Sequence, residues 1–90
     1  MASDRLAIER VQTGVRMEKR LVKVLRAFAD YLDMSMGDLL EGIILHALEN
    51  KPLQFSPPML DAINNLKEVY GLDLVAADSH QLVETSSDDA

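Results

Sequence analysis

Apolar and polar residues alternate between Arg10 and Met17, and this two-residue period predicts a short β-strand over residues 10–17. The polar face of the strand carries Gln12, Gly14 and Arg16. A single strand leaves its backbone hydrogen-bonding groups without partners, and no second strand pattern precedes the helices. We therefore expect this strand to pair with a second copy of the chain. Its apolar face consists of Val11, Thr13, Val15 and Met17.

From Lys19 the apolar residues recur at three- and four-residue intervals, which predicts an amphipathic helix ending near Leu32. Asp33 and Met34 then form a tight connection, because Asp is one of the few residues that accept a left-handed backbone. This turn leads directly into a second helix.

Ser35 is the expected N-cap of the second helix, and Asp38 stands three residues later, as in a capping box. This helix is expected to reach about Glu49. It is apolar on nearly all sides, so one strand and one helix of the same chain cannot cover it. Gly42 lowers helix stability and is expected to mark the close approach of another backbone. Both features favour an interlocked homodimer.

A third helix is predicted at about 57–70, within a C-terminal extension spanning residues 51–77. Ser56 is its cap, Pro57 and Pro58 suit its first turn, and Gly71 suits its end. The remaining residues, 78–90, are polar and acidic, and we expect them to be disordered.

The chain has 90 residues, enough for one domain, and it lacks cysteine, which excludes disulfides and thiolate metal ligands. It contains neither an apolar run of about 20 residues nor a signal-peptide pattern, so we expect a cytoplasmic protein. Although the net charge is −6, residues 1–27 carry seven basic and three acidic groups. This asymmetry predicts an anion-binding front, with residues 1–9 as a flexible basic arm.

The strand, helix, tight turn and capped helix over residues 10–50 resemble the ribbon-helix-helix family of DNA-binding proteins. The resemblance rests on the segments Gln12-Thr13-Gly14-Val15-Arg16-Met17 and Asp33-Met34-Ser35-Met36-Gly37-Asp38-Leu39-Leu40. It implies a mainly α fold in which two chains pair their strands into an antiparallel ribbon that enters the major groove of DNA.

The resemblance places the outward residues Gln12, Gly14 and Arg16 at the base-reading positions of the ribbon. Arg pairs with guanine and Gln with adenine, whereas Gly14 offers no side chain. The start of the second helix is expected to contact phosphate through its free N–H groups, although the cap alone also explains Ser35. The expected phosphate-binding residues are Arg10, Lys19, Arg20, Lys23, Ser35, Met36 and Gly37.

The apolar residues of the strand and both helices are expected to form the dimer core beneath the ribbon. These residues are Val15, Met17, Leu21, Leu25, Phe28, Leu40, Ile43, Ile44 and Leu48.

The chemistry of the remaining residues favours binding over catalysis. No nucleophile is paired with a base and no phosphate-binding glycine loop is present, so we expect neither an enzyme nor a cofactor. His46 is expected to be a core or interface residue, not a metal ligand, because only His80 accompanies it.

The sequence therefore predicts a homodimeric transcriptional regulator or repressor that binds double-stranded DNA. Two alternatives keep the same fold. In the first, the chain is an antitoxin whose C-terminal part binds a toxin protein. In the second, it is a scaffolding dimer that does not bind DNA, as Gly14 and the net charge favour.

Overall fold

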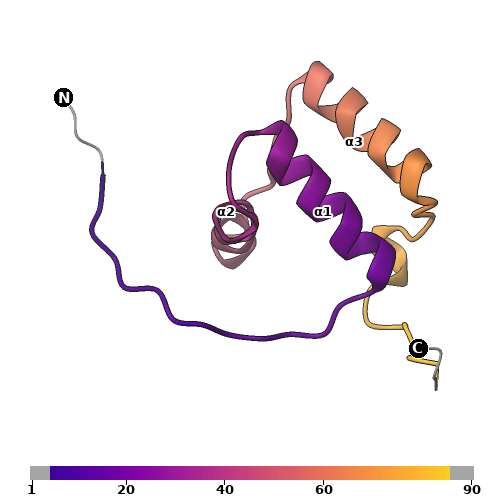
Figure 1. Ribbon diagram of the computed structural model, residues 1–90, viewed down its shortest axis with the longest axis horizontal. Helices are drawn as coiled ribbons and strands as arrows, with labels where there is room; N and C mark the ends of the chain where they lie inside the picture. Colours follow the sequence, from indigo (N-terminus) through magenta and orange to yellow (C-terminus); the bar gives the residue numbers. More distant parts are fainter. Residues whose placement is uncertain (1–4, 86–90) are drawn as a thin grey trace.

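The computed structural model describes residues 5–85, which form three α-helices and one short 3-10 helix (Figure 1). In Figure 1, α1 lies between the other two helices, with α3 along one side and α2 on the other. Among the described residues, no helix has both the length and the apolar character needed to cross a membrane. The elements are α1 (Lys19–Tyr31), α2 (Met36–Leu48), α3 (Pro57–Tyr70) and η1 (Ala76–Asp78).

Helix α1 begins where the Glu18 side chain accepts a hydrogen bond from the backbone N–H of Leu21 at 2.9 Å. It ends at Tyr31, as predicted, and Asp33 follows with φ of 59°. The predicted left-handed turn is therefore confirmed. It reverses the chain within four residues and places α2 beside α1.

Helix α2 begins after Ser35, whose hydroxyl accepts a hydrogen bond from the backbone N–H of Asp38 at 3.0 Å. The predicted cap is confirmed. The Asp38 carboxylate accepts instead from Arg10. Only Leu39 is buried in this helix, so most of its apolar surface is uncovered within one chain.

Helix α3 has the predicted ends. The Ser56 hydroxyl accepts from the backbone N–H of Met59 at 3.4 Å, and the two prolines occupy the first turn, where a missing N–H is harmless. Gly71 ends the helix with φ of 67°, a conformation that glycine adopts without strain. The next residue, Leu72, donates its N–H to the Lys67 carbonyl at 2.8 Å, which closes the last turn.

The core lies where α1 meets α2 and α3. Its buried residues are Phe28 and Ala29 of α1 and Leu39 of α2. The ring of Phe28 contacts that of Phe55 edge-on, with centroids 5.5 Å apart. The third helix is part of this core through Met59, Ile63 and Leu66. Half-buried side chains packed around it are Leu25, Leu32, Ile43, Phe55, Met59, Ile63 and Leu66.

The predicted β-strand over residues 10–17 is wrong, and so are the ribbon and the ribbon-helix-helix fold class that depend on it. Residues 5–18 form an exposed, irregular trace before α1 (Figure 1). A strand needs a neighbouring strand to accept and donate its ladder hydrogen bonds. The described part of the chain contains no such neighbour, so the alternating side chains do not produce a strand.

Two smaller expectations also change. A Cβ atom added to Gly42 would meet nothing within 4 Å, so no backbone approaches this glycine within one chain. His46 is exposed near the end of α2, where its Nδ1 lies 2.8 Å from the Gly42 carbonyl oxygen, and it is not a core residue of the single chain. Parts of the predicted arm and tail, residues 1–4 and 86–90, lie outside the described residues.

Candidate nucleic-acid interface

Three basic side chains form an exposed stripe on α1. Lys19, Lys23 and Arg26 stand at positions i, i+4 and i+7, which lie on one face of a helix. Within residues 5–85, none of the three is in an ion pair. Asp30 follows Arg26 by four residues on the same face, so three positive charges and one negative charge leave a net charge of +2 there. We call Lys19, Lys23 and Arg26 the basic stripe.

Arg10 is held against α2 by two acidic side chains. Its guanidinium donates to Glu41 at 2.8 and 2.9 Å and to Asp38 at 3.0 Å. The hydrogen bond and charge of Arg10 hold the pKa of Glu41 below its ordinary value, although desolvation opposes this shift. Arg10, an expected phosphate contact, is therefore already bound to carboxylates.

Arg16 forms an ion pair with Glu84 of the C-terminal segment. Both side chains are largely exposed, at 82% for Arg16 and 67% for Glu84. Exposed pairs of this kind contribute little stability and are screened by salt. Arg16, the expected base-reading residue, is thus held in a weak ion pair within the chain.

Arg20 is the most constrained of the expected phosphate contacts. Its guanidinium donates to Glu18, to Asp73 and to the Gly71 carbonyl, at distances between 2.8 and 3.0 Å. The hydrogen bond to Glu18 is the largest of the effects that raise the pKa of Arg20. These contacts join the start of α1 to the chain that follows α3, so Arg20 has a structural role.

Gln12 and Gly14 are exposed in the segment before α1. No atom lies within 4 Å of a Cβ placed on Gly14, and no residue in the described range hydrogen-bonds the Gln12 amide. Both positions are therefore accessible to a ligand. Their use in base reading stays a prediction.

The start of α2 is a less favourable phosphate site than the basic stripe. The Ser35 hydroxyl already accepts the N–H of Asp38, and the Asp38 and Glu41 carboxylates add negative charge within the first two turns. Met36 is half-buried and Gly37 exposed. These facts account for Ser35 as a cap, and its contact with phosphate remains a prediction.

The expected dimer-core residues divide into two groups. Leu21, Leu25, Phe28, Leu40 and Ile43 are buried or half-buried within the single chain. The other group is exposed and consists of Val15, Met17, Ile44 and Leu48.

The structure thus places three exposed basic groups without ion-pair partners in the described range on one face of α1. Arg26 is absent from the individually predicted phosphate contacts, although the basic groups of residues 5–26 are together expected to contact the DNA backbone. Its i+7 spacing from Lys19 places both on one face. No sequence signal pairs Arg16 with Glu84. Neither a protein-family model nor a curated protein or solved structure matches the chain.

Proposed function

We propose that the chain acts as a homodimeric transcriptional regulator that binds double-stranded DNA through the basic stripe and the exposed segment before α1. The observation that carries this proposal is the stripe itself, Lys19, Lys23 and Arg26, free of internal ion pairs within the described residues. The acidic groups of the chain are concentrated after residue 27. A charge separation of this kind favours one orientation toward a polyanion.

The length of the stripe suits a phosphate backbone. Seven residues of α-helix span about 10 Å, and one DNA strand carries a phosphate every 3.4 Å along the duplex axis. Each lysine or arginine that neutralises a phosphate releases counterions, which makes binding strongly dependent on salt. Gln12 and Arg16, in the adjoining segment, have the chemistry to contact base edges.

The exposed apolar surface of α2 supports the homodimer. Ile44, Leu45 and Leu48 are 51%, 63% and 78% exposed and lie on one side of the helix. Exposed aliphatic side chains gathered on one side of a helix are typical of a protein–protein contact.

A scaffolding dimer that does not bind DNA is the competing function, and a specific observation favours it. Arg10, Arg16 and Arg20 are all bound to carboxylates of the same chain. The net charge of −6 also opposes long-range attraction to DNA. The two functions differ in whether the basic stripe contacts phosphate.

Fluorescence anisotropy with a labelled random duplex, measured at several salt concentrations, tests the proposal. We expect binding at low salt that weakens steeply as salt rises. A variant with Lys19, Lys23 and Arg26 all changed to Gln should lose most of this affinity and most of the salt dependence. A control variant changes two cations outside the stripe, Lys51 and Lys67, to Gln and should bind DNA as the original chain does. A variant with only Lys19 and Lys23 changed to Gln matches it in charge and should lose affinity.

A second measurement separates base reading from phosphate binding. On a duplex selected from random DNA, Arg16→Ala should cost about 1–3 kcal/mol and relax sequence preference, whereas Lys23→Ala should weaken all sequences alike. If the unaltered chain fails to bind DNA even at low salt, the scaffolding function replaces the proposed one.

A further inference from the structure

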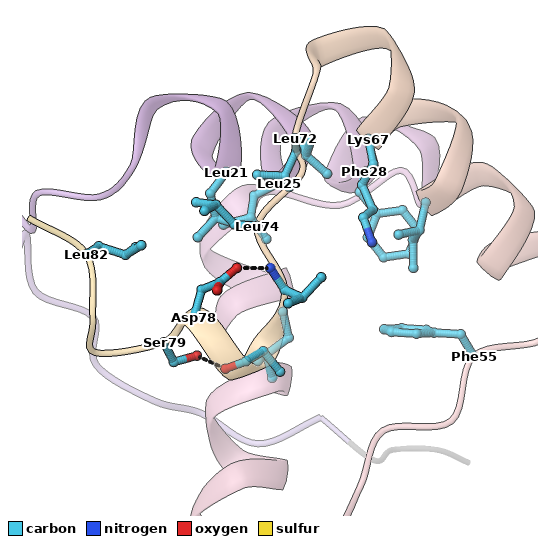
Figure 2. Close-up of a pocket in the computed structure, with 15 residues that line it drawn as sticks. Leu21, Leu25, Phe28, Phe55, Lys67, Leu72, Leu74, Asp78, Ser79 and Leu82 are labelled. Carbon is cyan, nitrogen blue, oxygen red and sulfur yellow. Dashed lines mark hydrogen bonds between the residues drawn. The ribbon is translucent and has the colours of Figure 1, made fainter.

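An apolar cavity of about 470 Å³ lies between α1, α3 and the segment that follows α3 (Figure 2). Its size falls within the range of small-molecule sites, about 300–1,000 Å³. None of the basic stripe contributes to it. The side chains that form most of its apolar wall include Leu21, Leu25, Phe28, Phe55, Ile63 and Leu74.

The wall opposite α1 and α3 is built by η1 and is held by local hydrogen bonds. The Asp78 carboxylate accepts from the backbone N–H of Val75 at 2.8 Å, and the Ser79 hydroxyl donates to the Ala76 carbonyl at 2.7 Å (Figure 2). These polar groups therefore satisfy one another. They close one side of the cavity without requiring a ligand.

Lys67 is the cationic member of the cavity wall. It stands in the last turn of α3 and is half-buried, and it lines the cavity together with Phe28 (Figure 2). Within the described residues, its ammonium group has neither an ion-pair partner nor a hydrogen-bond acceptor. A cation that borders apolar side chains can pair with an anion bound beside them.

We propose that this cavity binds an amphipathic carboxylate, a small molecule with an apolar body and one carboxylate group. The apolar body fills the space between α1, α3 and η1, and the carboxylate accepts hydrogen bonds from the Lys67 ammonium. The wall holds one cation, Lys67, and one carboxylate, Asp78, and the Asp78 carboxylate already accepts the Val75 N–H. Lys67 is therefore the charged group that a ligand can pair with, which favours an anionic occupant over an apolar segment of a second copy. The proposal does not depend on DNA binding.

Isothermal titration of the full chain with decanoate, kept below its micelle concentration, tests this site. We expect saturable binding of one decanoate per chain. Lys67→Met keeps the aliphatic stem and removes the charge, so it should weaken decanoate binding about ten-fold or more. Lys51→Met is the matched control, because Lys51 is exposed and outside the cavity wall, and it should leave binding unchanged.

Binding of decanol, an uncharged compound with the same chain length as decanoate, tests whether each variant keeps the cavity. Decanol should bind the original chain and Lys67→Met with equal affinity, since it lacks the charge that Lys67 recognises. Ala76→Trp places an indole in the cavity from an exposed position on η1 and should abolish binding of both compounds. Circular dichroism should show unchanged helix content in each variant.

Three results would overturn the proposal: no saturable decanoate binding, equal decanoate affinity in Lys67→Met, or equal binding of decyltrimethylammonium. The first of these, together with dissociation of a dimer by Ala76→Trp, would instead assign the cavity to a second copy of the chain.

Discussion

Arg16 and Glu84 are separated by 68 positions in the sequence, and their side chains form an ion pair. This contact brings the acidic C-terminal segment to the basic segment before α1. The same arginine is the expected base reader, and a DNA contact of Arg16 would require this ion pair to break. DNA and the C-terminal segment are therefore expected to compete for Arg16.

Removing this competitor should strengthen DNA binding. Because exposed ion pairs are weak, we expect Glu84→Gln to raise affinity for a duplex about two- to five-fold at low salt, with the gain lost at high salt. Asp61→Asn removes the same charge from an exposed position on α3 and serves as the control. An equal gain in both variants, measured by anisotropy, would show that net charge and not the Arg16 contact is responsible.

The exposed side of α2 should carry the dimer contact. Leu45→Lys should abolish association at micromolar concentration, because it places a charge in the centre of an apolar interface. Val69→Lys changes an equally apolar residue, 72% exposed on α3, and should leave the dimer intact. Sedimentation velocity measures whether each variant is a monomer or a dimer. A monomeric original chain at these concentrations would contradict the homodimer directly.

The third helix should be required for stability, because its residues Met59, Ile63 and Leu66 pack against the buried core that contains Phe28. Truncation after Lys51 should therefore lower the melting temperature markedly. Phe28→Ala in the full chain should cost about 3–5 kcal/mol. If the 1–51 fragment unfolds at the same temperature as the full chain, α3 is instead a docking element for another protein.

Removing the N-cap of α2 should lower the stability of the chain less than removing α3 does. Ser35→Ala removes the acceptor for the Asp38 N–H and should destabilise the chain by about 1 kcal/mol, a fall of roughly 4–8 °C in Tm. Ser35→Asp keeps an acceptor and should retain most of the stability. Scanning calorimetry compares the two, and equal losses would show that the hydroxyl does not act as the cap.

The contact between Arg10 and Glu41 should depend on pH. The Arg10 hydrogen bond and charge lower the pKa of Glu41 from its ordinary value of 4.5. A carboxyl group with a lowered folded-state pKa adds stability above its unfolded pKa, and that stability is lost as pH falls through the folded value. The segment before α1 should therefore separate from α2 in acid.

Titration of the Glu41 carboxyl by NMR checks this dependence. Arg10→Gln should move the pKa of Glu41 upward toward 4.5, since the guanidinium is its main source of stabilisation. Lys51→Gln, which removes a distant positive charge, should leave the Glu41 titration unchanged. A Glu41 pKa that does not respond to Arg10→Gln would show that the two side chains are not paired in solution.

The helices were predictable because their signals are local. Ser35, Ser56 and Gly71 fix helix ends within a few residues, and Asp33 supplies the turn through its own backbone preference. The strand was not predictable, because alternation describes where side chains point and says nothing about whether a second strand is present.

The candidate interface was likewise predictable only where its signals are local in the sequence. The sequence identifies the basic residues of α1, and the spacing of Lys19, Lys23 and Arg26 places these three on one face. It does not reveal that Arg10 and Arg16 are bound to carboxylates, because those partners lie 28 to 68 positions away and are brought near only by tertiary structure. The position of Lys67 at an apolar cavity likewise depends on how α3 packs against α1.

The local character of these helix signals has a consequence for folding rates. Helices of this length form in about a microsecond, and short connections such as the turn at Asp33 bring neighbours together quickly. For the proposed homodimer, the encounter of two chains is then the slow step. Refolding half-times should lengthen on dilution, while the early gain of helix signal stays independent of protein concentration.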